Sequence, residues 1–135
     1  MLVSNYRVTV WNFDSGLNEL LNAQKSWYDK RIKRYVHTND VKAKNDALCR
    51  RWIAHYLTDV RIKNPVQITY RFYVKDKKHD RSNVLSAFIK SFEDALQDCH
   101  VIENDTYDLV LDPIIHFDVD RKNPRVECEI NEVTK

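Results

Sequence analysis

An alternating segment that leads through a short polar loop into a helical one places the strongest constraint on the fold of this chain. Between Gln67 and Val74, apolar and aromatic residues at every second position alternate with mostly polar ones, which is the period of a strand with one buried face. From Ser82 to Asp98 the apolar residues recur at helical spacing instead. These apolar residues are Val84, Leu85, Phe88, Ile89, Phe92 and Leu96. We therefore expect a strand and a helix that share a core, joined by a polar loop over 75–81.

The rest of the chain supplies a second helix and further strands. Asp40 can cap a helix that runs to about Ile62, after which Asn64-Pro65 ends the pattern. Residues 17–39 follow the only glycine, Gly16, and have no clean period, so we expect a loop with one or two helical turns. Strands are predicted over 6–13, 109–111, 114–119 and 125–130. This order predicts an α+β fold, a single domain over 1–135 in which two main helices pack on a mixed β-sheet.

Length and composition exclude several classes of protein. A chain of 135 residues suits one domain, and it contains no run of about 18 apolar residues and no signal-peptide pattern near its start. We therefore expect a cytoplasmic protein with no membrane partner. The three cysteines are odd in number and far apart, which argues against a disulfide framework and predicts reduced thiols. A zinc site stays open as a less favoured alternative, because its four candidate ligands match no finger spacing: His79, Cys99, His100 and Cys128.

The small net charge of +2 conceals an asymmetry along the chain. Residues 25–63 contain about eleven basic and four acidic side chains, whereas residues 93–135 contain about four basic and twelve acidic ones. A basic segment beside an acidic one can indicate phosphate binding beside a metal site, since a metal-dependent nuclease needs cations for the phosphate backbone and carboxylates for Mg²⁺. Two solvated faces, one on a helix and one on a sheet, would give the same asymmetry.

The helix that starts near Ser82 also has a polar side. Asn83, Lys90 and Asp94 fall within a narrow arc, because seven and eleven residues are close to whole numbers of turns. Asp80 precedes this helix, and Asp105 follows it in the acidic segment Glu103-Asn104-Asp105. A carboxylate pair with a nearby lysine can hold Mg²⁺ against a phosphodiester. A solvated helix face is the competing interpretation.

The order and spacing of these residues resemble the RusA family of Holliday-junction resolvases. The family motif reads approximately Asp-x-Asp-Asn, then a helix with Lys and Asp-Ala-Leu, then two apolar residues, any residue and Asp-Asp. The corresponding segments here are Asp80-Arg81-Ser82-Asn83, Lys90-Ser91-Phe92-Glu93-Asp94-Ala95-Leu96 and Val101-Ile102-Glu103-Asn104-Asp105. The likeness covers about two thirds of the chain in outline and is specific only over 80–105.

The resemblance implies a Mg²⁺-dependent endonuclease, with Mn²⁺ as a substitute, that resolves four-way DNA junctions by paired cuts in recombination or repair. It implies a homodimer in the cytoplasm of a bacterium or a phage-infected host. Asp80 and Asp105 would bind the metal, and Lys90 would act as a phosphate or transition-state cation. Asn83 and Asp94 would support them.

Two positions depart from the family motif. Ser82 and Asn104 stand where the family has carboxylates, which removes negative charge from the predicted metal site. Glu93 or Glu103 could supply the missing charge, and Ser82 could cap the helix. Two alternatives therefore stay open: a junction-binding protein of the same fold that no longer cuts, and an interaction domain with no role in nucleic-acid binding.

The basic segment supplies candidates for contact with DNA phosphates. Aromatic residues lie among them, and Trp27, Tyr28 and Tyr35 could either stack on opened bases or pack against the domain. The candidate phosphate contacts are Lys30, Arg31, Lys33, Arg34, Lys42, Lys44, Arg50 and Arg51.

Overall fold

The computed structural model describes residues 2–11, 27–29, 34–36, 38–74, 81–104, 106 and 108–134. Within these ranges the chain forms a four-stranded sheet, a two-stranded sheet and two helices. The strands of the larger sheet are β1 (Leu2–Trp11), β4 (Val66–Val74), β5 (Ile114–Val119) and β6 (Arg125–Val133). The smaller sheet pairs β2 (Trp27–Asp29) with β3 (Arg34–Val36), and the helices are α2 (Thr38–Tyr56) and α3 (Arg81–Asp98).

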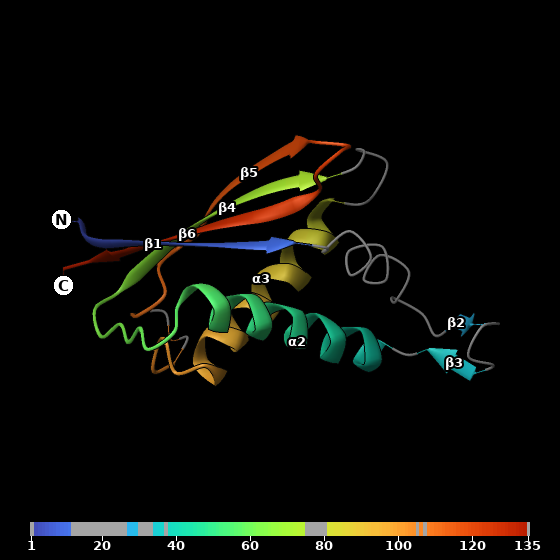
Figure 1. Cartoon of the computed structure of the whole chain (residues 1–135), viewed down its shortest axis with the longest axis horizontal. Helices are drawn as coiled ribbons and strands as arrows, with labels where there is room; N and C mark the ends of the chain where they lie inside the picture. Colours follow the sequence, from blue (N-terminus) through green and yellow to red (C-terminus); the bar gives the residue numbers. More distant parts are fainter. Residues whose placement is uncertain are drawn as a thin grey trace.

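The larger sheet is mixed, as expected. Its strand order is β1-β6-β4-β5, with β6 antiparallel to both β1 and β4, and β5 parallel to β4. Both helices lie on the same face of the sheet (Figure 1). The other face carries polar side chains such as Arg7, Arg71 and Glu129. The α+β fold predicted from the sequence, with two main helices on a mixed sheet, is therefore confirmed.

One hydrophobic core fills the space between the sheet and the helices. In β4, residues 66, 68, 70, 72 and 74 are buried while the intervening ones are mostly half-buried, because alternate side chains of a strand point to opposite faces. Phe88 and Phe92 of α3 pack edge-on against Tyr70, with ring centroids 6.2 and 5.8 Å away. α2 adds Cys49 and Ile53 to the same cluster.

Local periodicity predicted three elements closely. The predicted strand ending at Val74 and the predicted helix 82–98 correspond to β4 and α3, and the predicted strand 114–119 corresponds to β5. The strand predicted over 125–130 extends to Val133 as β6. The strand predicted over 6–13 begins four residues earlier and is described up to Trp11.

Two predictions were wrong. The helix expected over 40–62 starts at Thr38, so Asp40 lies inside it, and it ends at Tyr56, because Asp59 takes a left-handed φ of 63°. The strand expected over 109–111 is reduced to a single parallel bridge between Val110 and Val66. Residues 17–39, where we expected a loop with one or two helical turns, are described only in part: β2 and β3 form strands, and the other residues before Thr38 lie outside the described ranges.

Two of the three cysteines belong to the core. Cys49, Cys99 and Cys128 are free, and Cys49 and Cys128 are buried. Burial raises the pKa of the Cys49 thiol to about 12, so this thiol stays protonated and packs as an apolar group. Among the described residues, no helix is long and apolar enough to cross a membrane.

Candidate functional site

The N-terminal part of the predicted motif lies at the junction of β4 and α3. β4 ends at Val74 and α3 begins at Arg81, and Asp80, the first predicted metal ligand, lies outside the described residues. The side chains of Ser82 and Asn83 also lie outside them. Ser82 is the second residue of α3, so the cap expected there is not confirmed, since a cap residue precedes the first helical one.

The middle of the motif forms an ion pair on the outer side of α3. Lys90 Nζ lies 3.3 Å from Asp94 Oδ1, an i,i+4 pair whose side chains are 59% and 25% exposed. The opposite side of the helix carries the buried Phe88, Phe92 and Leu96. The structure therefore brings two predicted site residues together and leaves the Lys90 ammonium accessible to a phosphate.

Glu93, one of the two possible replacement carboxylates, affects the pKa of a tyrosine in the core. The pKa of the Tyr70 phenol is raised well above its ordinary value, mainly by burial and further by Cys128 and Glu93. Glu93 therefore lies within electrostatic reach of the core phenol, and it is only half-buried. Glu103, the other possible replacement, is exposed after the C-terminal end of α3.

The C-terminal end of α3 is closed by a Schellman motif. His100 has a left-handed φ of 59°, its N–H donates to Gln97 O at 2.9 Å, and Val101 N–H donates to Leu96 O at 2.9 Å. Val101 O then accepts a hydrogen bond of 2.7 Å from Ile62 N–H, which holds this turn close to the start of β4. The sequence has no glycine at this position, so it did not indicate the turn.

Asn104, where the family motif has an aspartate, has a local structural role. Its Oδ1 accepts a hydrogen bond of 3.1 Å from the N–H of Thr106, an Asx turn across the position of Asp105. Asp105, the second predicted metal ligand, lies outside the described residues. The amide at 104 therefore stabilises the backbone of this segment.

The described neighbours of the two predicted ligands lie at opposite ends of α3. Arg81 begins the helix and Asn104 follows its C-terminal turn. A helix of 18 residues is about 27 Å long at 1.5 Å per residue. The turn at 99–102 folds back on Leu96 and Ile62, which keeps the segment at that end of the helix. Within one copy of the chain, the described backbone does not bring these two flanks together.

The described residues also contain no alternative metal centre. No group of three or more histidine, cysteine, aspartate or glutamate side chains in these ranges could hold a metal ion. The zinc alternative fails for the same described part of the chain, because Cys128 is buried in the core while Cys99 Sγ lies 3.9 Å from Arg50 O, close enough to donate to it. The described residues therefore supply no Mg²⁺ site by themselves, and the two predicted ligands, Asp80 and Asp105, lie outside them.

α2 carries the described part of the predicted DNA-binding surface. Lys44 and Arg51 are exposed, and the Arg51 guanidinium lies 5.7 Å from the centre of the Trp52 ring. Arg50 Nη1 lies 3.4 Å from Asp98 Oδ2, an exposed pair that connects α2 to α3. Five other candidates lie outside the described residues or have side chains that do: Lys30, Arg31, Lys33, Arg34 and Lys42.

An aromatic cluster at the end of α2 was not predicted as a site. Trp52 and Tyr56 stack with centroids 6.0 Å apart, and His55 packs edge-on against both rings. Tyr56 is 41% exposed. The spacing of three and four residues between these side chains was the available signal, since such residues share one side of a helix. The exposed Tyr56 ring suits contact with unpaired bases, whereas Trp52 is half-buried against the core.

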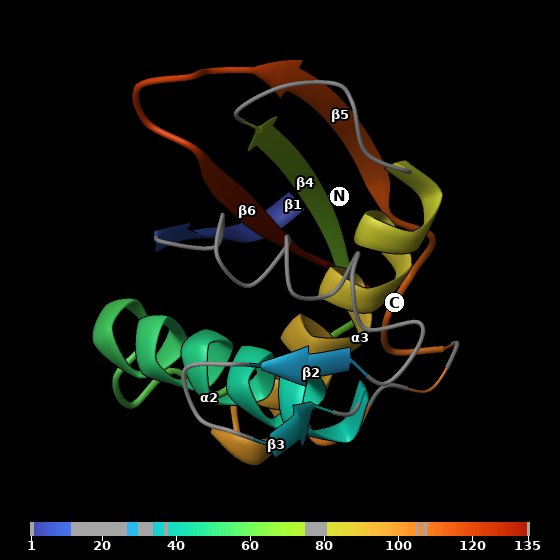
Figure 2. The ribbon, with the colours of Figure 1, turned by 90° about the vertical axis from the view of Figure 1, so that its right-hand side faces the viewer.

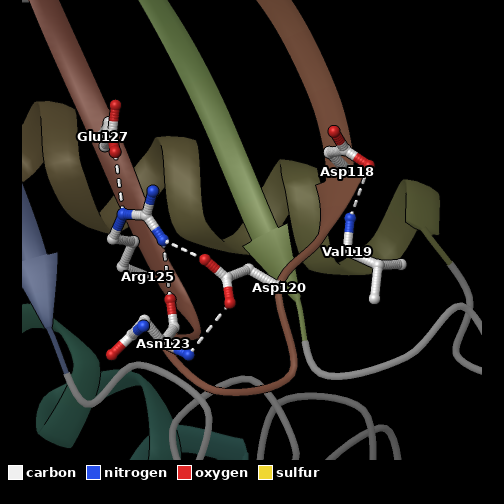
Figure 3. Close-up of polar contacts among 6 residues, drawn as sticks. All are labelled: Asp118, Val119, Asp120, Asn123, Arg125 and Glu127. Atoms are coloured by element: carbon white, nitrogen blue, oxygen red, sulfur yellow. Dashed lines mark hydrogen bonds and ion pairs between the residues drawn. The ribbon is translucent and has the colours of Figure 1, made fainter.

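Sequence analysis also missed a network around Arg125, at the C-terminal end of β4 (Figure 3). Arg125 Nε donates to Glu127 at 2.7 Å, and Nη1 donates to Asp120 at 2.9 Å and to Asn123 O at 2.8 Å. The Arg125 hydrogen bond and the Asn123 N–H lower the pKa of Asp120. Both carboxylates are therefore engaged with the guanidinium.

The polar face of the sheet carries a second set of ion pairs. Arg7 and Arg71 lie 3.3 and 3.9 Å from Glu129, on three adjacent strands. They border a shallow hollow of about 450 Å³ that also reaches Tyr73 and Glu127. Acidic and basic groups alternate here, so this face does not form the single-sign surface that DNA phosphates favour. In the sequence, only the alternating charges of the predicted strands could have indicated these ion pairs.

Comparison with known proteins does not identify a relative. The chain matches no protein-family model and no curated protein.

Proposed function

We propose that this protein binds four-way DNA junctions and cuts them as a metal-dependent endonuclease of the RusA kind, in the cytoplasm of a bacterial or phage-infected cell. The proposal comes from the resemblance of the motif over 80–105. One structural observation carries it further: Lys90 and Asp94 pair on the outer side of a helix that directly follows a core strand. The accessible ammonium of Lys90 would offset charge at a phosphate.

The α2 surface supplies the second support for the proposal. Lys44, Arg50 and Arg51 lie on one helix, with the ring cluster of Trp52 and Tyr56 beside them. Guanidinium and ammonium groups neutralise phosphates whatever the base sequence, and exposed rings can stack on bases at an opened junction. Such a surface would recognise DNA structure more than sequence. Mg²⁺, or Mn²⁺ in its place, would supply an activated water when bound.

Binding without cleavage is the second candidate, and a specific observation favours it. The described neighbours of Asp80 and Asp105 lie at opposite ends of α3, and Ser82 and Asn104 lack the family carboxylates. A site with fewer carboxylates binds Mg²⁺ more weakly. In this case the basic surface still binds four-way junctions, and the protein protects or marks them without cutting.

A cleavage assay with a labelled four-way junction separates the two candidates. Wild-type protein, Asp80→Asn and Asp105→Asn are each incubated in Mg²⁺ and in Mn²⁺. Asp112→Asn is the matched control, because Asp112 is an exposed acidic residue of the same C-terminal region. Paired, symmetric nicks that disappear in the two variants but persist in the control support the endonuclease.

Binding is measured in parallel over a range of salt concentrations. Tight, steeply salt-dependent binding without nicks in either metal supports the non-cutting candidate, because release of counterions from phosphates produces that slope. Neither binding nor nicks would overturn both candidates in favour of a domain without a nucleic-acid role.

A further inference from the structure

The C-terminal parts of the two helices lie close together. α2 and α3 lie next to each other on one side of the sheet in both views (Figures 1 and 2), and Arg50 of α2 pairs with Asp98, the last residue of α3, at 3.4 Å. The connection that follows α2 meets the turn that follows α3, because Ile62 N–H donates to Val101 O at 2.7 Å. These two segments border an open hollow of about 410 Å³.

Three basic side chains surround this hollow. Its lining contains Arg61, Lys63 and His100, all of them exposed, and one carboxylate, that of Glu103. Arg61 and Lys63 flank the buried Ile62, so both can face the hollow while Ile62 packs in the core. The hollow therefore combines a guanidinium, an ammonium and an imidazole with a single acidic group.

These basic side chains are not neutralised within the part of the chain that the structure describes. No carboxylate in that part forms an ion pair with Arg61, Lys63 or His100, although Glu103 lines the same hollow. Arg61 Nη1 donates to Val60 O at 2.8 Å, which uses one of its N–H donors and leaves its charge unpaired. An imidazole has at least one N–H donor in either charge state. The hollow therefore presents positive charge together with hydrogen-bond donors.

The end of α3 does not oppose the binding of an anion here. The last carbonyl groups of a helix carry partial negative charge. In α3, Leu96 O accepts from Val101 N–H and Gln97 O accepts from His100 N–H, each at 2.9 Å. Because the turn covers these oxygens, the side chains of the lining decide which charge the hollow binds.

The positive charge of the hollow continues toward α2. The pKa of the Cys99 thiol is raised, mainly by burial and further by Asp98, whereas Arg50 and Arg61 lower it. Both guanidinium groups therefore lie within electrostatic reach of the same thiol. Arg51 follows Arg50 on α2 and is exposed, so the basic groups extend from α2 to the hollow.

We propose that the hollow lined by Arg61, Lys63 and His100 binds one phosphate group of the DNA backbone, beyond the end of the α2 surface. That the phosphate belongs to DNA rests on the proposed function, whereas the preference for a phosphate rests on the lining. A guanidinium binds phosphate as a planar fork, an ammonium binds it as a point charge, and the imidazole adds a further donor. Because Glu103 directly precedes Asn104, the bound phosphate lies at the Asn104 end of α3.

An NMR titration with inorganic phosphate tests the site without DNA and without metal. The full, ¹⁵N-labelled chain is titrated at constant ionic strength, and we expect saturable shifts centred on the amides of Arg61, Lys63 and His100. The double variant with Arg61→Gln and Lys63→Gln should weaken this binding by about 10-fold or more, because charged donors to the phosphate are lost. The matched control removes one arginine and one lysine from exposed positions elsewhere, Arg121→Gln with Lys122→Gln, and should bind phosphate as the wild type does.

Binding to a four-way junction over a range of salt concentrations tests whether the phosphate belongs to DNA. The double variant should bind more weakly and reduce the salt slope by about 1, because the phosphate in the hollow is no longer neutralised. Circular dichroism confirms that each variant is folded.

Two results of the phosphate titration overturn the inference: no saturable shift at the hollow, and equal phosphate binding by the wild type and the double variant. If the double variant loses phosphate binding but keeps the wild-type salt slope for the junction, the assignment to DNA is overturned. If the wild type does not bind junctions at all, the proposed function fails, and the phosphate titration still decides whether the hollow is a phosphate site.

Discussion

The Arg125 guanidinium lies over the Tyr73 ring, with its central carbon 4.1 Å from the ring centroid. The two residues are cross-strand partners at the point where β6 begins and β4 is about to end. The same guanidinium binds Asp120 and Glu127, and it is 17% exposed. Arg125 therefore fixes the 120–124 connection against the end of β4.

Replacing Arg125 should destabilise the fold. Arg125→Lys keeps the charge but loses the planar fork that bonds to two carboxylates and stacks on the ring. We expect a loss of about 2 kcal/mol in the free energy of unfolding, measured by urea denaturation. Arg121→Lys, at an exposed position in the same connection, is the control and should change little. Equal stability of both variants would show that the network is not structural.

The same network predicts an acid-dependent loss of stability. The pKa of Asp120 lies below the ordinary value of 3.8, mainly because of the hydrogen bond from Arg125. The folded state thus binds this proton more weakly than the unfolded chain, so the contribution is present above about pH 4 and is lost as the pH falls through the folded pKa. Asp120→Asn should flatten the fall in unfolding free energy below about pH 4. Asp112→Asn should show the same pH dependence of the unfolding free energy as the wild type. If Asp120→Asn also shows the wild-type pH dependence, Asp120 does not contribute to the acid-dependent loss of stability.

Removing the buried Tyr70 hydroxyl should stabilise the fold. Tyr70 is 0% exposed, and its oxygen has no hydrogen-bond partner among the described residues. A buried polar group without a partner costs free energy, whereas the ring itself packs against Phe88 and Phe92. Tyr70→Phe should therefore raise the unfolding free energy by about 1 kcal/mol. Tyr73→Phe, on the polar face, is the control, and a destabilised Tyr70→Phe would reveal a partner for the hydroxyl.

Variants of Arg50 and Asp98 distinguish a role of α2 in stability from a role in DNA binding. Their pair is largely exposed, so Arg50→Gln and Asp98→Asn should each change stability by no more than about 0.5 kcal/mol. Junction binding should respond differently. Arg50→Gln should weaken it and reduce its salt slope by about 1, whereas Asp98→Asn should not weaken it. Equal effects of the two variants on binding would remove α2 from the proposed DNA surface.

The homodimer that the resemblance to the RusA family implies and the proposed nuclease together predict complementation. If catalytic sites draw one carboxylate from each copy, a heterodimer of Asp80→Asn and Asp105→Asn contains one site with both residues intact. Mixing the two inactive proteins, with time for subunit exchange, should then restore single nicks in the labelled junction. Asp80→Asn mixed with itself at the same concentration is the control. A mixture that stays inactive would place both residues of a site in the same copy.

The sequence alone was enough to identify β4, α3 and β5, because each has a strong local period. Alternation over 67–74 and helical spacing over 84–96 depend on neighbouring side chains, and these neighbours are the same in any tertiary context. The same local signal placed Lys90 and Asp94 on one side of α3, where they pair.

Other features were decided by contacts between distant segments. The 109–111 segment pairs with β4 only at Val110. The Arg125 network needs β4, β6 and the 120–124 connection side by side. The position of Asn104 relative to Arg81 depends on the turn after α3, which Ile62 holds from another part of the chain. Sequence spacing predicted which residues share one face of α3. Only tertiary packing decided that the segment after α3 stays at the C-terminal end of the helix, because Ile62 holds the turn there through a long-range hydrogen bond.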